Sequence, residues 1–423
     1  MKRICRAVSV MLALAVAGVT LAAPAVASPT QQGSPGDFAR LLSFVTVPAS
    51  PEQFAGIWVT YADPGAVKRL HGFSYTNIGE TPPPVPNDAT DLTPDQLRTR
   101  QWSWDMGAMD LPRAAGAGYA REWHRELGYD QFSVERALGA GQPPDDYGVI
   151  ELAVDTAVVG ENLLGHQYER EPAPHGYNGT LYRKHGDHQQ SIQDPIGRMA
   201  LSSMNRVAIG PGILLAGRAT DRVDAALAAH TGTVPSLATV PAVAQVVAAV
   251  EAPDLLPGTT LVSSSLLGIG WAPIVVDPGQ IVFNAASPEE ARRAAEAAIR
   301  EAEALPLLPP YLLYALAYHR GAEQSERFQT FTLLYPDETV ARAAGAALTA
   351  RIAAYRSARN GEPMLGTDVV EQLEPVVRSG AGGATVTARL RLSPDHRNLF
   401  YQRLFNRDLG FLAPGGAPAA SNP

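Results

Sequence analysis

Histidines gather in one short stretch of this 423-residue chain, where imidazole and carboxylate groups could together bind a metal ion. His185, Asp187 and His188 are near neighbours in the sequence, and His175 lies a little upstream. Neutral imidazole and ionised carboxylate are ligands that zinc accepts. Gly186 disfavours a helix that would align His185 with His188, so the same residues also fit a polar surface loop. Two interpretations stay open: a zinc site formed by these four residues, or a solvated loop with no cofactor.

Three tryptophans lie close together in the sequence and could form a flat surface for a ligand. Trp102, Trp104 and Trp123 follow a proline-rich stretch, from Gly79 to Pro94, that is typical of a long surface loop. Aromatic rings offer stacking area to a sugar or a peptide at a small entropic cost. Tryptophans also fill hydrophobic cores, so the sequence leaves both ligand binding and core packing open.

Common catalytic signatures are missing from the sequence. It contains no G-x-S-x-G, H-E-x-x-H, S-x-x-K or P-loop pattern. Asp145 and Asp146 are adjacent and lead into an expected strand, so their carboxyl groups should point to opposite faces and not converge on one bond. We therefore assign no catalytic residue, although distant residues can still assemble a catalytic site in a folded chain.

The N-terminus has the three parts of a secretory signal peptide. Basic residues precede an apolar run, and Ala25-Val26-Ala27 supplies the small residues after which signal peptidases cut. We predict a signal peptide at 1–27 and a secreted or extracytoplasmic mature chain. Position 28 is serine, whereas lipid attachment would need a cysteine there. The apolar run is almost long enough to cross a bilayer, so a retained anchor is the alternative.

The composition excludes several kinds of chemistry. Cys5 is the only cysteine and lies in the predicted signal peptide, so the mature chain lacks disulfides, thiolate ligands and a cysteine nucleophile. The net charge is −8, and cleavage would remove three cations and make the mature chain more acidic. An acidic chain argues against nucleic acid as a partner and against stable attachment to an anionic membrane after cleavage.

Proline, glycine and small polar residues divide the chain into segments. Such residues dominate both ends and recur where we place a domain boundary, between 252 and 258. The predicted organisation is a disordered linker at 28–36, a first α+β domain at 37–252, a second α+β domain at 258–411 and a disordered tail at 412–423.

One unit recurs six times: a short apolar strand, a capping residue and an amphipathic helix. Ser, Thr or Asp at the helix start accepts a hydrogen bond from an otherwise unpaired amide, and Pro fits the first helical position. The strands begin at Ile57, Val149, Ile213, Ile281, Thr330 and Thr385, and their caps are Asp63, Asp155, Thr220, Ser287, Asp337 and Ser393.

Alternation of residue type favours antiparallel sheets over a buried parallel one. The last strand, 385–392, alternates apolar with polar residues, as a sheet with one wet face requires. Glycine-rich turns at 210–212 and 380–383 indicate hairpins, which only antiparallel neighbours allow. The order strand, helix, hairpin, helix occurs in both halves. We therefore predict an α+β protein of two ferredoxin-like, split-βαβ modules with antiparallel sheets and helices packed mainly on one face.

Two segments carry a resemblance to a family. Residues 129–152, YDQFSVERALGAGQPPDDYGVIEL, resemble a segment of uncharacterised exported proteins and lipoproteins of Gram-positive and related bacteria. In that family a short helix leads through PPD into a strand, and Glu135, Ala137, Leu138 and Gly141 fill its places here. Residues 330–352 are similar to a strand-helix unit in the second halves of such proteins. The resemblance implies an envelope or secreted location and brings no catalytic residue.

Two classes of function remain. The first is an exported, non-catalytic protein that binds a small ligand, an envelope component or a partner protein through its paired modules. The second is an extracytoplasmic hydrolase or metal-binding protein with a site near His185 and His188. Convergence of the four candidate ligands on one point, or of a serine, a histidine and an acid in one pocket, would favour the second class.

Overall fold

A computed structural model gives the fold of the chain. It describes residues 36–81, 92–107, 109–116, 118–142, 144–268, 287–290, 293, 296–297, 300, 304–321, 323, 326–357, 361–394 and 408–415. The predicted signal peptide and most of the predicted linker lie outside the described residues. No helix within these ranges is both long enough and apolar enough to cross a membrane.

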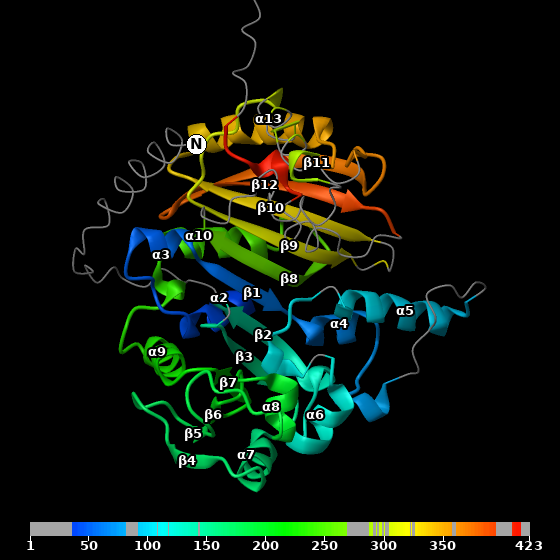
Figure 1. Cartoon of the computed structure of the whole chain (residues 1–423). Coiled ribbons are helices and arrows are strands. Elements are labelled where there is room, and N and C mark those ends of the chain that lie inside the picture. Colours follow the sequence, from blue (N-terminus) through cyan, green and yellow to red (C-terminus); the bar gives the residue numbers. More distant parts are fainter. Residues whose placement is uncertain are drawn as a thin grey trace, which may run out of the picture.

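A single antiparallel sheet runs through the described part of the chain (Figure 1). Its strand order is β11-β12-β10-β9-β8-β1-β2-β3-β7-β6-β5-β4. The strands are β1 Trp58–Ala62, β2 Val134–Ala140, β3 Tyr147–Leu152, β4 Glu169–Pro172, β5 Thr180–Arg183, β6 Arg206–Gly210, β7 Ile213–Gly217, β8 Thr259–Gly268, β9 Leu313–Gly321, β10 Arg327–Tyr335, β11 Val369–Gly380 and β12 Gly383–Leu392. The predicted combination of helices with antiparallel strands is confirmed.

Helices of varied length connect the strands. The α-helices are α2 Asp37–Leu41, α3 Pro51–Ala55, α4 Pro64–Leu70, α5 Pro94–Gly107, α6 Ala120–Leu127, α7 Thr156–Gly165, α8 Pro195–Ala200, α9 Thr220–His230, α10 Pro241–Glu251 and α13 Glu338–Ala354. Short 3-10 helices are η1 Leu42–Phe44, η2 Ile78–Glu80, η3 Arg113–Ala115, η4 Gln131–Ser133, η5 Leu237–Thr239 and η7 Gly410–Leu412.

Three of the predicted helix caps are confirmed. Asp63 accepts a hydrogen bond from the Ala66 amide at 2.6 Å, and Asp155 and Asp337 cap α7 and α13 in the same way. Thr220 differs, because it is the first residue of α9 and the helix starts without a side-chain cap. Ser287 accepts from the Glu290 amide at 3.2 Å. The strand expected before Ser287 and most of the helix expected after Ser393 lie outside the described residues.

Both predicted hairpins are confirmed. β6 and β7 pair up to Gly210 and Ile213, and β11 and β12 pair up to Gly380 and Gly383. In the first turn Gly212 has a φ of 70°, a left-handed conformation that glycine adopts without a steric penalty. The residues of these turns therefore set the local register, as the sequence indicated.

The two halves share one sheet. In the second half α13 links β10 to the β11–β12 hairpin, and β12 lies next to β10. In the first half β7 lies next to β3 in the same way, but α7, β4, β5 and α8 all lie between β3 and the β6–β7 hairpin in the sequence. We expected two sheets. Instead, β1 pairs with β8 from Trp58 opposite Leu267 to Ala62 opposite Ser263, and this pairing joins the halves across the predicted domain boundary.

Helices cover both faces of the sheet, which corrects the expectation that they pack mainly on one. α13 contributes Ala344 and Leu348 to the core cluster that contains Leu333 of β10. α10 contributes Val243 and Val247 to a different cluster, which contains Leu334. Successive side chains of a strand point to opposite faces, so α10 and α13 lie on opposite sides. Of the polar positions of β12 that we expected to be wet, Thr387 is buried for this reason, whereas Arg389 is half-buried and Arg391 is exposed.

Two further segments differ from expectation. Residues 134–140, which the family resemblance suggested as part of a short helix, form β2, because pairing with β1 and β3 on both sides outweighs the local helical preference of Glu, Ala and Leu. Residues 412–415, assigned by composition to a disordered tail, are held by Arg351, whose guanidinium donates to the carbonyls of Ala413 and Gly415 at 2.8 and 2.9 Å.

Candidate functional site

The four candidate zinc ligands do not meet at one point. Among the described residues, no group of three or more His, Cys, Asp or Glu side chains is arranged to hold a metal ion. Asp187 pairs with Arg206 at 2.7 Å and accepts from Thr220, while His185 lies 3.5 Å from Asp194. His175, His185 and His188 all have positive φ, so the segment is a sharply turned loop. This geometry matches the polar-loop interpretation, and Arg206 occupies the position beside Asp187 that a cation would take.

The three tryptophans do not form one ligand platform. Trp102 and Trp123 are 4% and 1% exposed and belong to different core clusters. Trp104 lies on the same helix as Trp102, with the Arg100 guanidinium 5.2 Å from its ring. The packing interpretation therefore fits Trp102 and Trp123.

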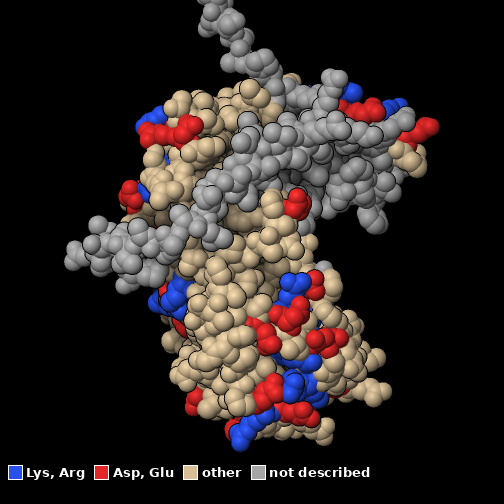
Figure 2. Space-filling view, turned by 90° about the vertical axis from the view of Figure 1, so that its left-hand side faces the viewer, with Lys and Arg blue, Asp and Glu red and all other residues tan. Residues whose placement is uncertain are grey.

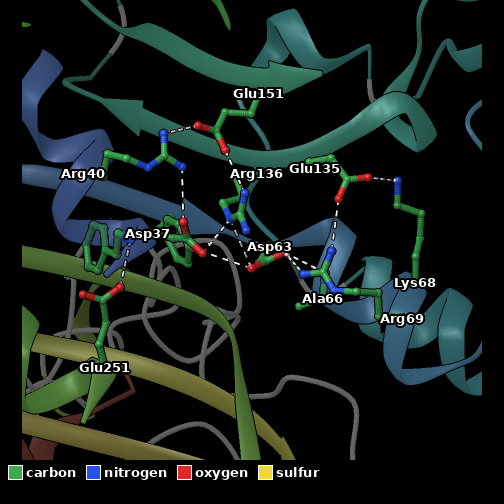
Figure 3. Close-up of polar contacts among 12 residues, drawn as sticks. Asp37, Arg40, Asp63, Ala66, Lys68, Arg69, Glu135, Arg136, Glu151 and Glu251 are labelled. Atoms are coloured by element: carbon green, nitrogen blue, oxygen red, sulfur yellow. Dashed lines mark hydrogen bonds and ion pairs between the residues drawn. The ribbon is translucent and has the colours of Figure 1, made fainter. Parts of the chain in front are cut away.

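A chain of alternating acids and bases joins the first half of the sheet to its flanking helices (Figure 3). Arg136 of β2 contacts Asp37 at 2.9 Å and Glu151 at 3.0 Å, and Glu151 also binds Arg40 of α2. Glu135 pairs with Lys68 of α4 at 2.8 Å. We call this group the junction network; its members are Asp37, Arg40, Asp63, Lys68, Arg69, Glu135, Arg136, Glu151 and Glu251.

Burial acts on two acids of the junction network. It raises the pKa of Asp63, whose side chain is 8% exposed, and it raises the pKa of Glu251, which accepts from the Phe38 amide at 2.8 Å. The outer members remain wet: the side chains of Arg40 and Arg69 are 40% and 58% exposed. Acids and bases also lie interspersed on the face of the molecule seen in Figure 2. The junction network therefore ties α2 and α4 to the sheet through balanced, partly solvated charges.

A second polar group lies inside the molecule, at the turn end of the β9–β10 hairpin. We call it the Asp105 cluster, and it consists of His71, Asp105, Tyr318, Arg320 and Arg327. Asp105 accepts from the Tyr318 hydroxyl at 3.0 Å, and Arg320 Nε lies 3.1 Å from its carboxylate. His71 Nε2 lies 2.8 Å from the same carboxylate, and because an ionised carboxylate only accepts, Nε2 carries the hydrogen.

Local structure explains how each element presents its member of the cluster. His71 directly follows α4, which Asp63 caps at the start. Asp105 lies one turn beyond Trp102 on α5, and Trp102 is fixed by the rings of Phe73, Tyr75 and Phe132, each with its centroid 5.5 Å away.

The strands position the cations of the cluster by register. Tyr318 and Arg320 are two residues apart on β9, so they share one face of the sheet. Arg327 of β10 is the direct cross-strand partner of Arg320. The two guanidinium groups therefore start from neighbouring positions on the same face.

The Asp105 cluster is deeply buried and rich in cations. Asp105 and Arg327 are each 1% exposed, and Arg320 is 0% exposed. Burial, followed by the charge of Asp105, raises the pKa of Tyr318, while the charges of Arg320 and Arg327 act in the opposite direction. Of the described carboxylates, Asp105 is the one that contacts the cluster. Arg320 thus has Asp105 as a partner, whereas no described carboxylate contacts Arg327.

Arg327 has one terminal nitrogen that is paired and one that lacks a partner in the described residues. One terminal nitrogen, Nη1, donates to the carbonyl of Pro394. The other, Nη2, is buried with no hydrogen-bond partner, and His71 Nδ1 is in the same state. Leaving a buried charged donor unsatisfied costs several kcal/mol by general estimates, so this arginine is an exception that needs an explanation.

Sequence reasoning missed every member of the Asp105 cluster. A signal was present in two strands, because Arg320 and Arg327 interrupt the otherwise apolar and uncharged runs LYALAYHRG and RFQTFTLLY. A charge at an inward position of a buried strand is rare enough to be a candidate site by itself. Nothing local connects these strands with His71 or Asp105.

Comparison of the chain with protein-family models, with curated proteins and with solved structures found no match.

Proposed function

We propose that this protein is an exported, non-catalytic binding protein and that its ligand occupies the Asp105 cluster. The observation that carries the proposal is the state of Arg327, whose guanidinium is 1% exposed while its Nη2 lacks a hydrogen-bond partner in the described residues. Natural interiors rarely leave such a donor unpaired. A bound ligand would supply the missing acceptor.

Export rests on the first residues of the sequence. The basic start, the apolar run and the small residues at 25–27 together favour cleavage and a location in the bacterial envelope or outside the cell, in agreement with the family resemblance. We also interpret each half as a ferredoxin-like module. In the second half α13 connects β10 to β11, with β12 between them in the sheet, and in the first half β7 likewise lies between β3 and β6, although that connection also contains β4, β5 and α8. In this interpretation the β1–β8 pairing makes the two modules one rigid support for the ligand site.

Native mass spectrometry of the chain from residue 28 onward, purified from the organism that encodes it, tests the proposal. We expect a species heavier than the denatured chain, and we expect that adduct to be lost from Arg327→Gln. The control is Arg69→Gln, which removes an arginine whose side chain is 58% exposed in the junction network, and which should keep the adduct. Identical masses for the native and denatured wild-type chain, or an adduct that Arg327→Gln retains, would contradict the proposal.

A hydrolase is the second candidate, and one contact favours it. Ser43 Oγ lies 2.9 Å from His230 Nδ1, the distance expected for a nucleophile and its base. The third member of a triad is an acid, whereas burial and the nearby cation Arg40 lower the pKa of His230. An active-site fluorophosphonate should therefore leave Ser43 unlabelled. Labelling of Ser43 that is lost in His230→Gln would instead establish the hydrolase.

A further inference from the structure

We propose that the ligand of the Asp105 cluster is a small oxyanion, bound by the guanidinium groups of Arg327 and Arg320. The inference rests on the proposed function, since it names the chemical class of ligand that the same cluster binds. It begins with the register of the sheet. Arg320 and Arg327 are direct cross-strand partners, and like charges in that position repel each other.

Asp105 contacts Arg320, one of the two guanidinium groups. Its two oxygens accept from His71 Nε2 at 2.8 Å and from the Tyr318 hydroxyl at 3.0 Å, and Arg320 Nε forms an ion pair with this carboxylate at 3.1 Å. No described carboxylate contacts Arg327. A negative charge next to Arg327 would balance this guanidinium, and its attraction would be strong because Arg327 is 1% exposed.

The free polar atoms define the class of anion. Arg327 Nη2 is a donor, and a planar guanidinium fits two oxygens of one carboxylate, phosphate or sulfate better than it fits a spherical halide. His71 Nδ1, the second atom without a partner, accepts a hydrogen when the ring is neutral. It therefore suits an oxyanion that carries a proton, such as hydrogen phosphate.

Burial limits the size of the group that enters. Every member of the cluster is at most 2% exposed, and Trp102 and Met106 of α5 are buried on the same side of the sheet. The group bound there is consequently a free small anion or the single acidic group of a larger molecule. Both sources share the same contact with Arg327.

Thermal unfolding of the chain from residue 28 onward tests the inference. The protein is exchanged into chloride buffer, and sodium phosphate, sodium sulfate or sodium acetate then replaces sodium chloride at constant ionic strength. We expect a saturable rise in the melting temperature with at least one oxyanion, because a ligand that binds only the folded state stabilises it. Arg327→Lys keeps the charge but not the two-pronged geometry, and should bind about ten-fold more weakly. Arg69→Gln should respond like the wild type.

The outcomes separate this inference from the proposed function. Stabilisation by free phosphate, sulfate or acetate that weakens in Arg327→Lys supports a free oxyanion. No response to free anions, together with an acidic organic adduct in native mass spectrometry, supports the acidic group of a larger molecule. A neutral adduct overturns the oxyanion while the binding function stands. No adduct and no response, or an equal response in Arg327→Lys and the wild type, overturns the inference.

Discussion

The junction network and the Asp105 cluster use the same kinds of side chain in opposite ways. The junction network has acids and bases in alternation, and its outer members, such as Arg40 and Arg69, are 40% and 58% exposed. In the Asp105 cluster, Arg320 contacts one carboxylate, no described carboxylate contacts Arg327, and both arginines are at most 1% exposed. Water and salt screen the charges of the junction network, whereas the buried charges of the Asp105 cluster are screened much less.

The charges of the junction network stabilise the fold, whereas the buried charge of Arg327 in the Asp105 cluster indicates a bound ligand. Exposed ion pairs contribute about 0 to 1 kcal/mol each, so the junction network can lose a member at small cost. A buried charge without its partner costs several kcal/mol, so the buried Arg327, which contacts no described carboxylate, is a far stronger sign of something bound. The four predictions below test how sharply the two regions differ in stability and in response to pH.

Asp105→Asn should have the largest effect. It removes the one described acid that contacts Arg320, which is 0% exposed, and we expect a loss of about 3 to 5 kcal/mol in the free energy of unfolding, measured by urea titration. Asp95→Asn is the control on the same helix, because the Asp95 side chain is 84% exposed and pairs with Arg98; it should cost less than about 1 kcal/mol. Equal losses in the two variants would end the distinction between the regions.

His319→Gln should change the response to acid. His319 lies between Tyr318 and Arg320 on β9, and burial lowers its pKa from 6.5 to about 4. In the wild type the unfolded chain takes up a proton below pH 6.5 before the folded protein does, so stability falls as the pH drops from 6.5 to about 4.

The expected size of that fall is about 3 kcal/mol, because one pKa unit corresponds to about 1.4 kcal/mol. His319→Gln should abolish it, while His188→Gln, in the exposed loop, should retain it. Urea unfolding at a series of pH values measures both. An acid response unchanged in His319→Gln would place the pH sensitivity elsewhere.

Arg136→Gln should have an intermediate effect on the junction network. Arg136 contacts Asp37, Glu151 and Asp63, and its side chain is 24% exposed. The substitution therefore removes several ion pairs, and solvent partly replaces them. We expect a loss of about 1 to 2 kcal/mol by urea titration, and less at high salt, because screening weakens the wild-type pairs. A loss as large as that of Asp105→Asn, or one insensitive to salt, would show that the network is not screened.

Glu251→Gln should have the smallest effect and the opposite pH dependence to His319. Burial raises the pKa of Glu251, so the folded protein keeps this proton to a higher pH than the unfolded chain does. Its contribution to stability is present below the unfolded pKa of 4.5 and is lost as the pH rises through the folded value. Glu251→Gln should remove that decline, whereas Glu169→Gln, on the exposed edge strand β4, should preserve it.

Much of the local structure was predictable from the sequence. Asp63, Asp155 and Asp337 cap helices because the side chain and the amide that it accepts from are two or three residues apart. The turns at Gly210 and Gly380 were predictable because each joins two strands that are only a few residues apart in the sequence. The candidate site was not predictable: the zinc ligands are separated, Trp102 and Trp123 lie in core clusters, and no member of the Asp105 cluster was selected.

The sequence by itself determined the caps, the hairpins, the antiparallel α+β character and the scarcity of cysteine, since each depends on composition or on residues a few positions apart. Only the tertiary structure decided that β1 pairs with β8, that α10 and α13 cover opposite faces, and that Tyr318 meets Asp105 across 213 positions of the chain. Such contacts depend on how whole elements pack, and many sequence-compatible packings differ only in which distant side chains they bring together.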